Sequence, residues 1–149
     1  MEDLPQLFSD LIRFETELWN TIDARLRDEH DLPLHRFEPM QVIARTPHCR
    51  VYDIAGELSL TTGGVSKIVD AIEAAGHCGR RPNPADRRSS LIELTPAGKK
   101  ALANATRTFE NELRALLGSA LSERSLGQFG IALKGLRGAL SEDAADRAA

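Results

Sequence analysis

Basic side chains gather in one short stretch of this 149-residue chain, between Gly79 and Lys100. The stretch holds six bases and two acids, a local charge of +4, although the net charge of the whole chain is −3. The six bases are Arg80, Arg81, Arg87, Arg88, Lys99 and Lys100. Residues 1–30, in contrast, hold eight acids and three arginines, a local charge of −5. A localised basic surface can bind phosphate even on an acidic protein, so nucleic-acid binding is the first chemistry to consider.

The four arginines of this stretch fall on a predicted β-hairpin. Residues 77–81 and 90–94 are short candidate strands, and the segment 82–88 between them is rich in turn formers. The tip of the hairpin, Asp86-Arg87-Arg88, is therefore basic. Arginine suits the narrow minor groove of DNA, because the negative potential of that groove attracts its planar cation. A hairpin of this kind is typical of a DNA-binding wing.

Two short helices are predicted immediately before the hairpin, over residues 52–58 and 62–75. A helix-turn-helix needs a small residue where the helices cross, a compact residue in the turn, and apolar residues that hold the second helix on the first. Ala55 and Ser59 meet the first two requirements, and Gly76 is a suitable stop after the second helix. The apolar positions are Ile54, Leu58, Val65, Ile68 and Ile72.

The outward face of the second helix carries short hydrogen-bonding side chains and one cation, a composition suited to close approach in the major groove. Its residues are Thr61, Thr62, Gly63, Gly64, Ser66, Lys67 and Asp70. Each of the two glycines costs a helix about 1 kcal/mol relative to alanine. They would let backbone N–H groups come near a phosphate or a base edge, or they simply fit a tight turn.

Long helices flank this central part. Residues 4–28 keep apolar side chains at three- and four-residue steps, and a shorter helix with Phe37, Met40 and Ile43 follows, in whose first turn Pro39 must lie. Thr95-Pro96 begins another long helix, Ser122 caps a last one, and the tail 142–149 is expected to fray. The apolar faces of the terminal helices are too large for one copy to cover, which indicates a dimer. A self-contained helical bundle is the alternative.

The stretch from Val51 to Gly98 resembles the MarR family of winged helix-turn-helix regulators. Asp86-Arg87-Arg88 is similar to the Asp-x-Arg motif of that family's wing, and Leu94-Thr95-Pro96-Ala97-Gly98 is similar to the Leu-Thr-x-x-Gly motif that follows it. Residues 72–76 followed by Arg80-Arg81 also resemble the end of the family's recognition helix and its first wing strand. The terminal helices match in pattern only.

The resemblance implies a mostly α fold with a small β-hairpin wing, in a single unit over 1–149. Within it, residues 36–95 would form the winged helix-turn-helix DNA-binding lobe, and residues 1–30 and 96–141 the helical dimerisation lobe. A homodimer would read a pseudo-palindrome in double-stranded DNA, as a repressor. Arg88 would enter the minor groove, with Asp86 orienting it through a salt bridge. The expected DNA-binding residues are Thr61, Thr62, Gly64, Ser66, Lys67, Arg80, Arg81, Asp86, Arg87 and Arg88. The front of the recognition helix lacks the family's usual arginine. We therefore expect the wing to contribute more to DNA binding than it does in most of the family.

Members of the family commonly release DNA when a small aromatic or anionic effector enters a crevice between the two lobes. Segments that would border this crevice carry Trp19, His35, Phe37, Met40 and His48. For any one of these residues, a place in the core or on the surface is the simpler interpretation. The first helix has no cysteine, and Cys49 and Cys78 are weak candidates for a redox role, so peroxide sensing is disfavoured.

Other functional classes fit the sequence less well. The four histidines have no metal-binding spacing, no serine or cysteine lies in a nucleophile motif, and no phosphate-binding glycine loop is present, so we expect neither an enzyme nor a cofactor or metal. No apolar run approaches the roughly 20 residues of a membrane span, and two cysteines outside CxxC spacing fit a reducing cytoplasm. The main alternative is a winged helix that contacts proteins without binding DNA, against which the basic wing argues.

Overall fold

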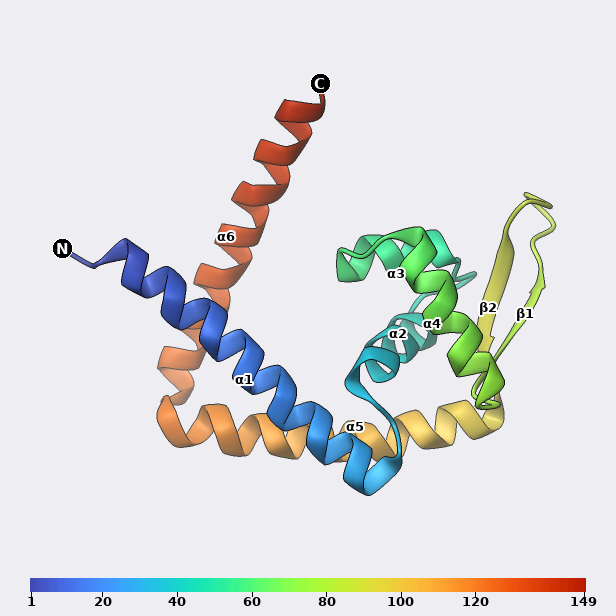
Figure 1. Ribbon diagram of the computed structural model, residues 1–149, viewed down its shortest axis with the longest axis horizontal. Coiled ribbons are helices and arrows are strands. Elements are labelled where there is room, and N and C mark those ends of the chain that lie inside the picture. Colours follow the sequence, from blue (N-terminus) through green and yellow to red (C-terminus); the bar gives the residue numbers. More distant parts are fainter. The chain divides into compact units, whose positions relative to one another are not determined.

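The computed structural model describes all residues, Met1–Ala149, and consists of helices and one β-hairpin (Figure 1). The elements are α1 (Leu4–His30), α2 (Leu34–Arg45), α3 (Val51–Leu58), α4 (Thr62–Ala74), β1 (Cys78–Pro82), β2 (Ser90–Leu94), α5 (Pro96–Ala120) and α6 (Glu123–Ala148). The predicted fold class, mostly α with a small hairpin wing, is confirmed. No helix is long and apolar enough to cross a membrane. The chain forms two compact units, Met1–Phe109 and Glu110–Ala149, and the boundary between them falls within α5.

The first unit has one continuous core, to which α1 contributes only near its C-terminal end. Ile22 and Leu26 are the buried residues of α1, and they are joined by side chains from α2, α4, β2 and the first half of α5. Phe37 of α2 is fully buried and packs against Phe109, with ring centroids 4.8 Å apart. Aromatic pairs at this spacing add about 0.5–1.5 kcal/mol beyond the area they bury. The core therefore holds the helix-turn-helix on a rigid base.

The hairpin is antiparallel, with Cys78 paired to Leu94 and Pro82 paired to Ser90. Its β2 strand is fixed to the body of the unit because Leu91, Ile92 and Leu94 are buried. The backbone N–H of Ile92 also donates to the Cys49 carbonyl, 2.7 Å away, in the segment before α3. The base of the wing is thus tied to the start of the helix-turn-helix.

Two local expectations from the sequence are wrong. Pro39 lies in the second turn of α2, not in its first, and the helix continues through it although proline cannot donate to the carbonyl of residue 35. Pro39 and its neighbour Met40 are both buried. The tail is helical as far as Ala148, where an ion pair between Arg147 and Asp143, 2.9 Å apart, spans one turn of α6.

The second unit consists of the end of α5 and all of α6. As predicted, Ser122 caps α6, and its hydroxyl accepts the N–H of Ser125 at 3.2 Å. No residue of α6 is buried in a single copy. The exposed large apolar side chains of this unit are Leu116, Leu121, Ile131, Leu136 and Leu140. This apolar surface is uncovered in the single chain.

Candidate nucleic-acid interface

The two central helices pack as the sequence pattern predicts. Ile54 and Ala55 of α3 are buried together with Val65 and Ile72 of α4. Ser59 begins the turn in the left-handed backbone region, at φ 54°. This conformation is higher in energy for a residue with a side chain than for glycine. The predicted contact at Ile68 is partial, because this residue is only half-buried, whereas its neighbour Val69 is fully buried.

The first three residues of α4 are exposed, as is Lys67 one turn later, so its outward face is free to approach a ligand. The Thr61 hydroxyl caps the helix by accepting the N–H of Gly64 at 3.1 Å. A Cβ added at Gly64 would lie 3.0 Å from this hydroxyl, so a side chain there would crowd the cap. A Cβ added at Gly63 would meet nothing within 4 Å, so packing inside the chain does not require this glycine. Thr62 and Lys67 are exposed, and Ser66 is half-exposed.

The tip of the wing is an ordered turn. The Asp86 carboxylate accepts the backbone N–H of Arg88 at 3.0 Å, and the Asp86 carbonyl accepts the N–H of Ser89 at 3.1 Å. The Asn83 side chain, which is almost fully buried, donates to the Ser89 hydroxyl at 3.0 Å and accepts the N–H of Ala85 at 3.0 Å. Sequence reasoning did not single out Asn83, although asparagine between two prolines is a typical turn residue.

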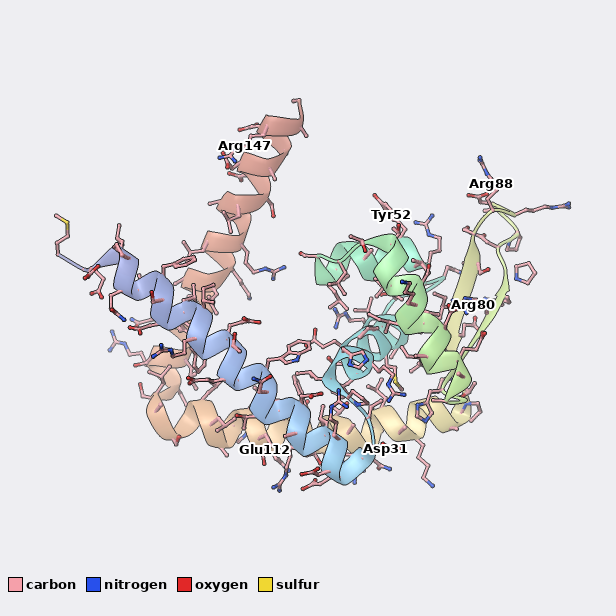
Figure 2. All side chains as sticks on the ribbon, in the orientation of Figure 1. Asp31, Tyr52, Arg80, Arg88, Glu112 and Arg147 are labelled. Atoms are coloured by element: carbon pink, nitrogen blue, oxygen red, sulfur yellow. The ribbon has the colours of Figure 1, made fainter.

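The two tip arginines extend into solvent. The side chain of Arg88 is 94% exposed, and its Nε lies 3.6 Å from Asp86, a loose ion pair (Figure 2). No hydrogen bond or ion pair holds the neighbouring side chain of Arg87. Both cations are therefore available to a negatively charged partner, while the backbone that carries them is fixed.

The two arginines at the base of the wing have partners within the protein. Arg80 donates to Asp70 at 2.7 Å and to Glu73 at 3.3 Å, so it connects β1 to the C-terminal half of α4. Figure 2 places Arg80 between the recognition helix and the hairpin, below the tip. Arg81 pairs with Glu93 across the hairpin at 2.7 Å. The DNA contacts predicted for Arg80 and Arg81 stay predictions. The observed ion pairs of Arg80 hold the wing against α4.

The junction between the wing and α5 explains the Leu-Thr-x-x-Gly motif. The Thr95 hydroxyl donates to the Gly76 carbonyl at 2.6 Å and accepts the N–H of Gly98 at 3.0 Å. A Cβ added at Gly98 would overlap the backbone oxygen of His77. Gly76 itself has a φ of 79°, which favours glycine. The motif thus fixes the direction in which α5 leaves the wing.

The five predicted effector-binding residues occupy different surroundings. Phe37 and Met40 have no exposed surface and belong to the core, whereas Trp19 and His35 are exposed on α1 and α2. Partial burial lowers the pKa of His35, and the nearby Arg36 and Arg27 lower it further. His48 lies apart from them, in a hollow beside the wing. The predicted effector site stays a prediction.

Both cysteines are buried and free. Burial raises the pKa of each thiol to about 11, with smaller contributions from Asp53 at Cys49 and from Glu73 at Cys78. Because the thiolate is the reactive form, both side chains have the properties of inert core residues at neutral pH.

Comparison with known proteins gives matches in family models and in solved structures. The model of the MarR family matches residues 32–90, which span the helix-turn-helix and the tip of the wing. The comparison with curated proteins gives no match.

Three of the similar solved structures illustrate the likeness. AbsC, a MarR family transcriptional regulator from Streptomyces coelicolor, shares 18% identity at a TM-score of 0.85, over 95% of this chain and 97% of its own. MepR from S. aureus, solved in a complex with DNA, shares 25% identity at a TM-score of 0.78, over 89% of this chain and 97% of its own. CouR from Rhodococcus jostii RHA1, solved with p-coumaroyl-CoA bound, shares 18% identity at a TM-score of 0.76, over 91% of this chain and 92% of its own. The match of the central segment and the fold shared over nearly the whole chain agree, and residues 32–90 of this protein are similar to the MarR family of winged helix-turn-helix transcriptional regulators.

Proposed function

We propose that this protein regulates transcription by binding duplex DNA as a homodimer, with α4 in the major groove and the wing tip in the adjacent minor groove. The observation that carries the proposal is the combination of an exposed recognition face on α4 with an ordered, basic wing tip beside it. Arg88 is 94% exposed on a turn whose backbone is held by Asp86 and Asn83. A cation on a pre-ordered turn loses less conformational entropy when it binds. The relative MepR, whose structure contains DNA, supports this assignment.

The dimer is supported by the apolar surface that a single copy leaves uncovered. Large apolar side chains of α1 are exposed along its first half, and α6 buries none of its residues. The exposed residues of α1 are Leu4, Leu7, Phe8, Leu11, Ile12, Phe14 and Trp19. Large exposed apolar side chains in such number on one element mark an interaction site. A two-fold dimer through the chain ends, 1–30 and 96–141, would cover it and present two winged lobes to a pseudo-palindromic operator.

A small effector is the expected control on binding, since the relative CouR holds p-coumaroyl-CoA. For this chain, exposed Trp19 and His35 are the proposed residues with which an aromatic or anionic effector makes contact. The proposed action is release of DNA by a repressor.

The test is DNA binding as a function of salt. Genomic fragments that bind the protein are selected first, and the affinity for one of them is measured by fluorescence anisotropy. If the wings and helix ends of a dimer contact about six phosphates, affinity should fall roughly a thousandfold between about 50 and 200 mM salt. An affinity that stays flat over this range, or the selection of no fragment, would favour the alternative, a winged helix that contacts proteins only.

A further inference from the structure

Arg50 and Tyr52, at the start of α3, form a second exposed group of side chains that the DNA-binding residues above do not include. The Arg50 guanidinium lies over the Tyr52 ring, 5.7 Å from its centroid. Tyr52 is 71% exposed, which is unusual for an aromatic residue in the folded unit of a small protein. Nothing in the core explains its position. In Figure 2 the side chains of Tyr52 and Arg88 extend to the same side of this unit, whereas Arg80 does not.

Asp53 holds the Arg50 side chain in place. Its carboxylate accepts the Arg50 backbone N–H at 2.9 Å and also contacts Nε at 3.3 Å and Nη2 at 3.4 Å. The guanidinium has five N–H donors, so donors remain for a second acceptor. Hydrogen bonds and charge from Asp53 raise the pKa of Arg50, and the more distant Asp86 of the wing acts in the same direction. Arg50 is therefore charged and held in place by Asp53.

A hollow of about 590 Å³ lies between Arg50 and the wing. Arg50, His48 and Arg81 supply basic or polar groups to its lining, and Pro84 and Leu91 supply apolar surface. The lining also contains the Asp53 carboxylate, which is paired with Arg50. A sugar–phosphate strand has the same two parts, an anionic phosphate and an apolar sugar. When a recognition helix lies in the major groove and a wing lies in the next minor groove, the strand between these grooves passes between the two elements. In helix-turn-helix proteins, the first helix crosses the backbone.

We propose that Arg50 and Tyr52 bind the phosphates of the DNA strand that runs between the major groove under α4 and the minor groove under the wing. The guanidinium of Arg50 contacts a phosphate by charge and hydrogen bonds, and the Tyr52 hydroxyl donates to the same phosphate or to its neighbour. This site rests on the proposed function. It adds sequence-independent affinity, because phosphate contacts fix register and carry no base information.

The experiment uses the full-length protein and a fluorescein-labelled duplex of mixed sequence, about 30 base pairs long, which accommodates two half-sites one helical turn apart. Anisotropy gives the slope of log affinity against log salt for the wild type, Arg50→Gln and Tyr52→Phe. A lost phosphate contact lowers the slope by about 0.9, so a dimer with Arg50→Gln should lose about 1.8 and bind roughly 10- to 100-fold more weakly. Tyr52→Phe should bind roughly 3- to 10-fold more weakly with the slope unchanged, because the lost donor is neutral.

The controls separate this site from general charge and from folding. Arg107→Gln removes the same charge from an exposed position on α5 in the same unit and should leave the slope nearly unchanged. Arg50→Lys keeps the charge and should keep most of the slope, which matters because Arg50 also pairs with Asp53 at the start of α3. Circular dichroism checks the fold of each variant.

Three results would overturn the proposal. A wild-type protein that does not bind, or binds without salt dependence, removes the proposed function and this site with it. A steep wild-type slope that Arg50→Gln and Arg107→Gln reduce equally leaves the proposed function intact and rejects the site. Inorganic phosphate at constant ionic strength should compete at the Arg50 site, so a loss of DNA binding that is equal in the wild type and in Arg50→Gln would mean that Arg50 contacts no DNA phosphate.

Discussion

The turn at the wing tip distinguishes two functions of the Asp86 carboxylate in DNA binding. The carboxylate lies near the place where DNA is expected, so charge counting predicts that its removal strengthens binding. In the structure it accepts the Arg88 backbone N–H at 3.0 Å, whereas the ion pair to the Arg88 side chain is long, at 3.6 Å, and exposed. The carboxylate acts mainly as a hydrogen-bond acceptor that orders the turn. Asp86→Asn keeps an acceptor oxygen and Asp86→Ala does not, so the two variants should behave differently.

The expected magnitudes follow from these contacts. An exposed ion pair contributes about 0.5 kcal/mol, and the hydrogen bond that orders the turn contributes about 1 kcal/mol. Asp86→Ala therefore loses about 1–1.5 kcal/mol per wing, or 2–3 kcal/mol for a dimer, which weakens operator affinity about 30- to 150-fold. The cost appears in binding because a loosened tip must be ordered when DNA is bound. Asp86→Asn should stay within about threefold of the wild type, since the lost ion pair is offset by the removal of a negative charge near phosphate.

The assay is fluorescence anisotropy on a selected genomic fragment at one salt concentration, with circular dichroism as the check on folding. Arg88→Ala should cost about 1–3 kcal/mol per contact, about doubled in the dimer, and Arg87→Ala should cost less although it removes the same charge. Tighter binding by Asp86→Ala would refute the reasoning, as would equal losses for Asp86→Asn and Asp86→Ala. Equal losses at Arg87 and Arg88 would mean that the wing is only a diffuse basic patch.

Three further predictions concern the frame that holds these residues. Gly98→Ala should lower the free energy of unfolding by about 2–3 kcal/mol, because its Cβ would overlap the backbone oxygen of His77. Gly118→Ala in the same helix, where an added Cβ meets nothing within 4 Å, should raise it by up to about 1 kcal/mol. Equal changes for both variants in urea denaturation would contradict this account. Arg80→Gln and Asp70→Asn should each lower the free energy of unfolding. The double variant should lose about 0.5–1 kcal/mol less than the sum of the two single losses, because the two side chains form one ion pair at 2.7 Å. Strictly additive losses would show that the pair contributes nothing to stability. Leu136→Glu should shift the protein from dimer to monomer in sedimentation equilibrium and weaken DNA binding as well, because this exposed apolar side chain packs against the second copy in the proposed dimer. A stable dimer of the variant would place the interface elsewhere.

Local chemistry in the sequence was enough to predict the order and type of the elements and the approximate bounds of most of them. Thr61 and Ser122 cap their helices with their own hydroxyls, and Gly76 ends a helix through its own φ. Each effect acts within a few residues of the chain and is visible in the residue types alone. The spacing of apolar side chains likewise predicted which faces of α3 and α4 meet, because a helix repeats every 3.6 residues. The residue types between the two strands likewise predicted that the tip of the wing is basic.

Only the tertiary structure decided what these residues contact. Arg80 and Arg88 have the same side chain on the same hairpin, yet one pairs with Asp70 on another helix and the other is 94% exposed. That difference depends on how β1 packs against α4. The type of each residue, taken alone, does not predict this packing. The need for Gly98 also arises from a backbone 21 residues away in sequence, at His77. The sequence does not show that Phe37, a predicted effector-binding residue, packs against Phe109 in the core. Such contacts join distant segments, so they become fixed only when the whole unit has folded.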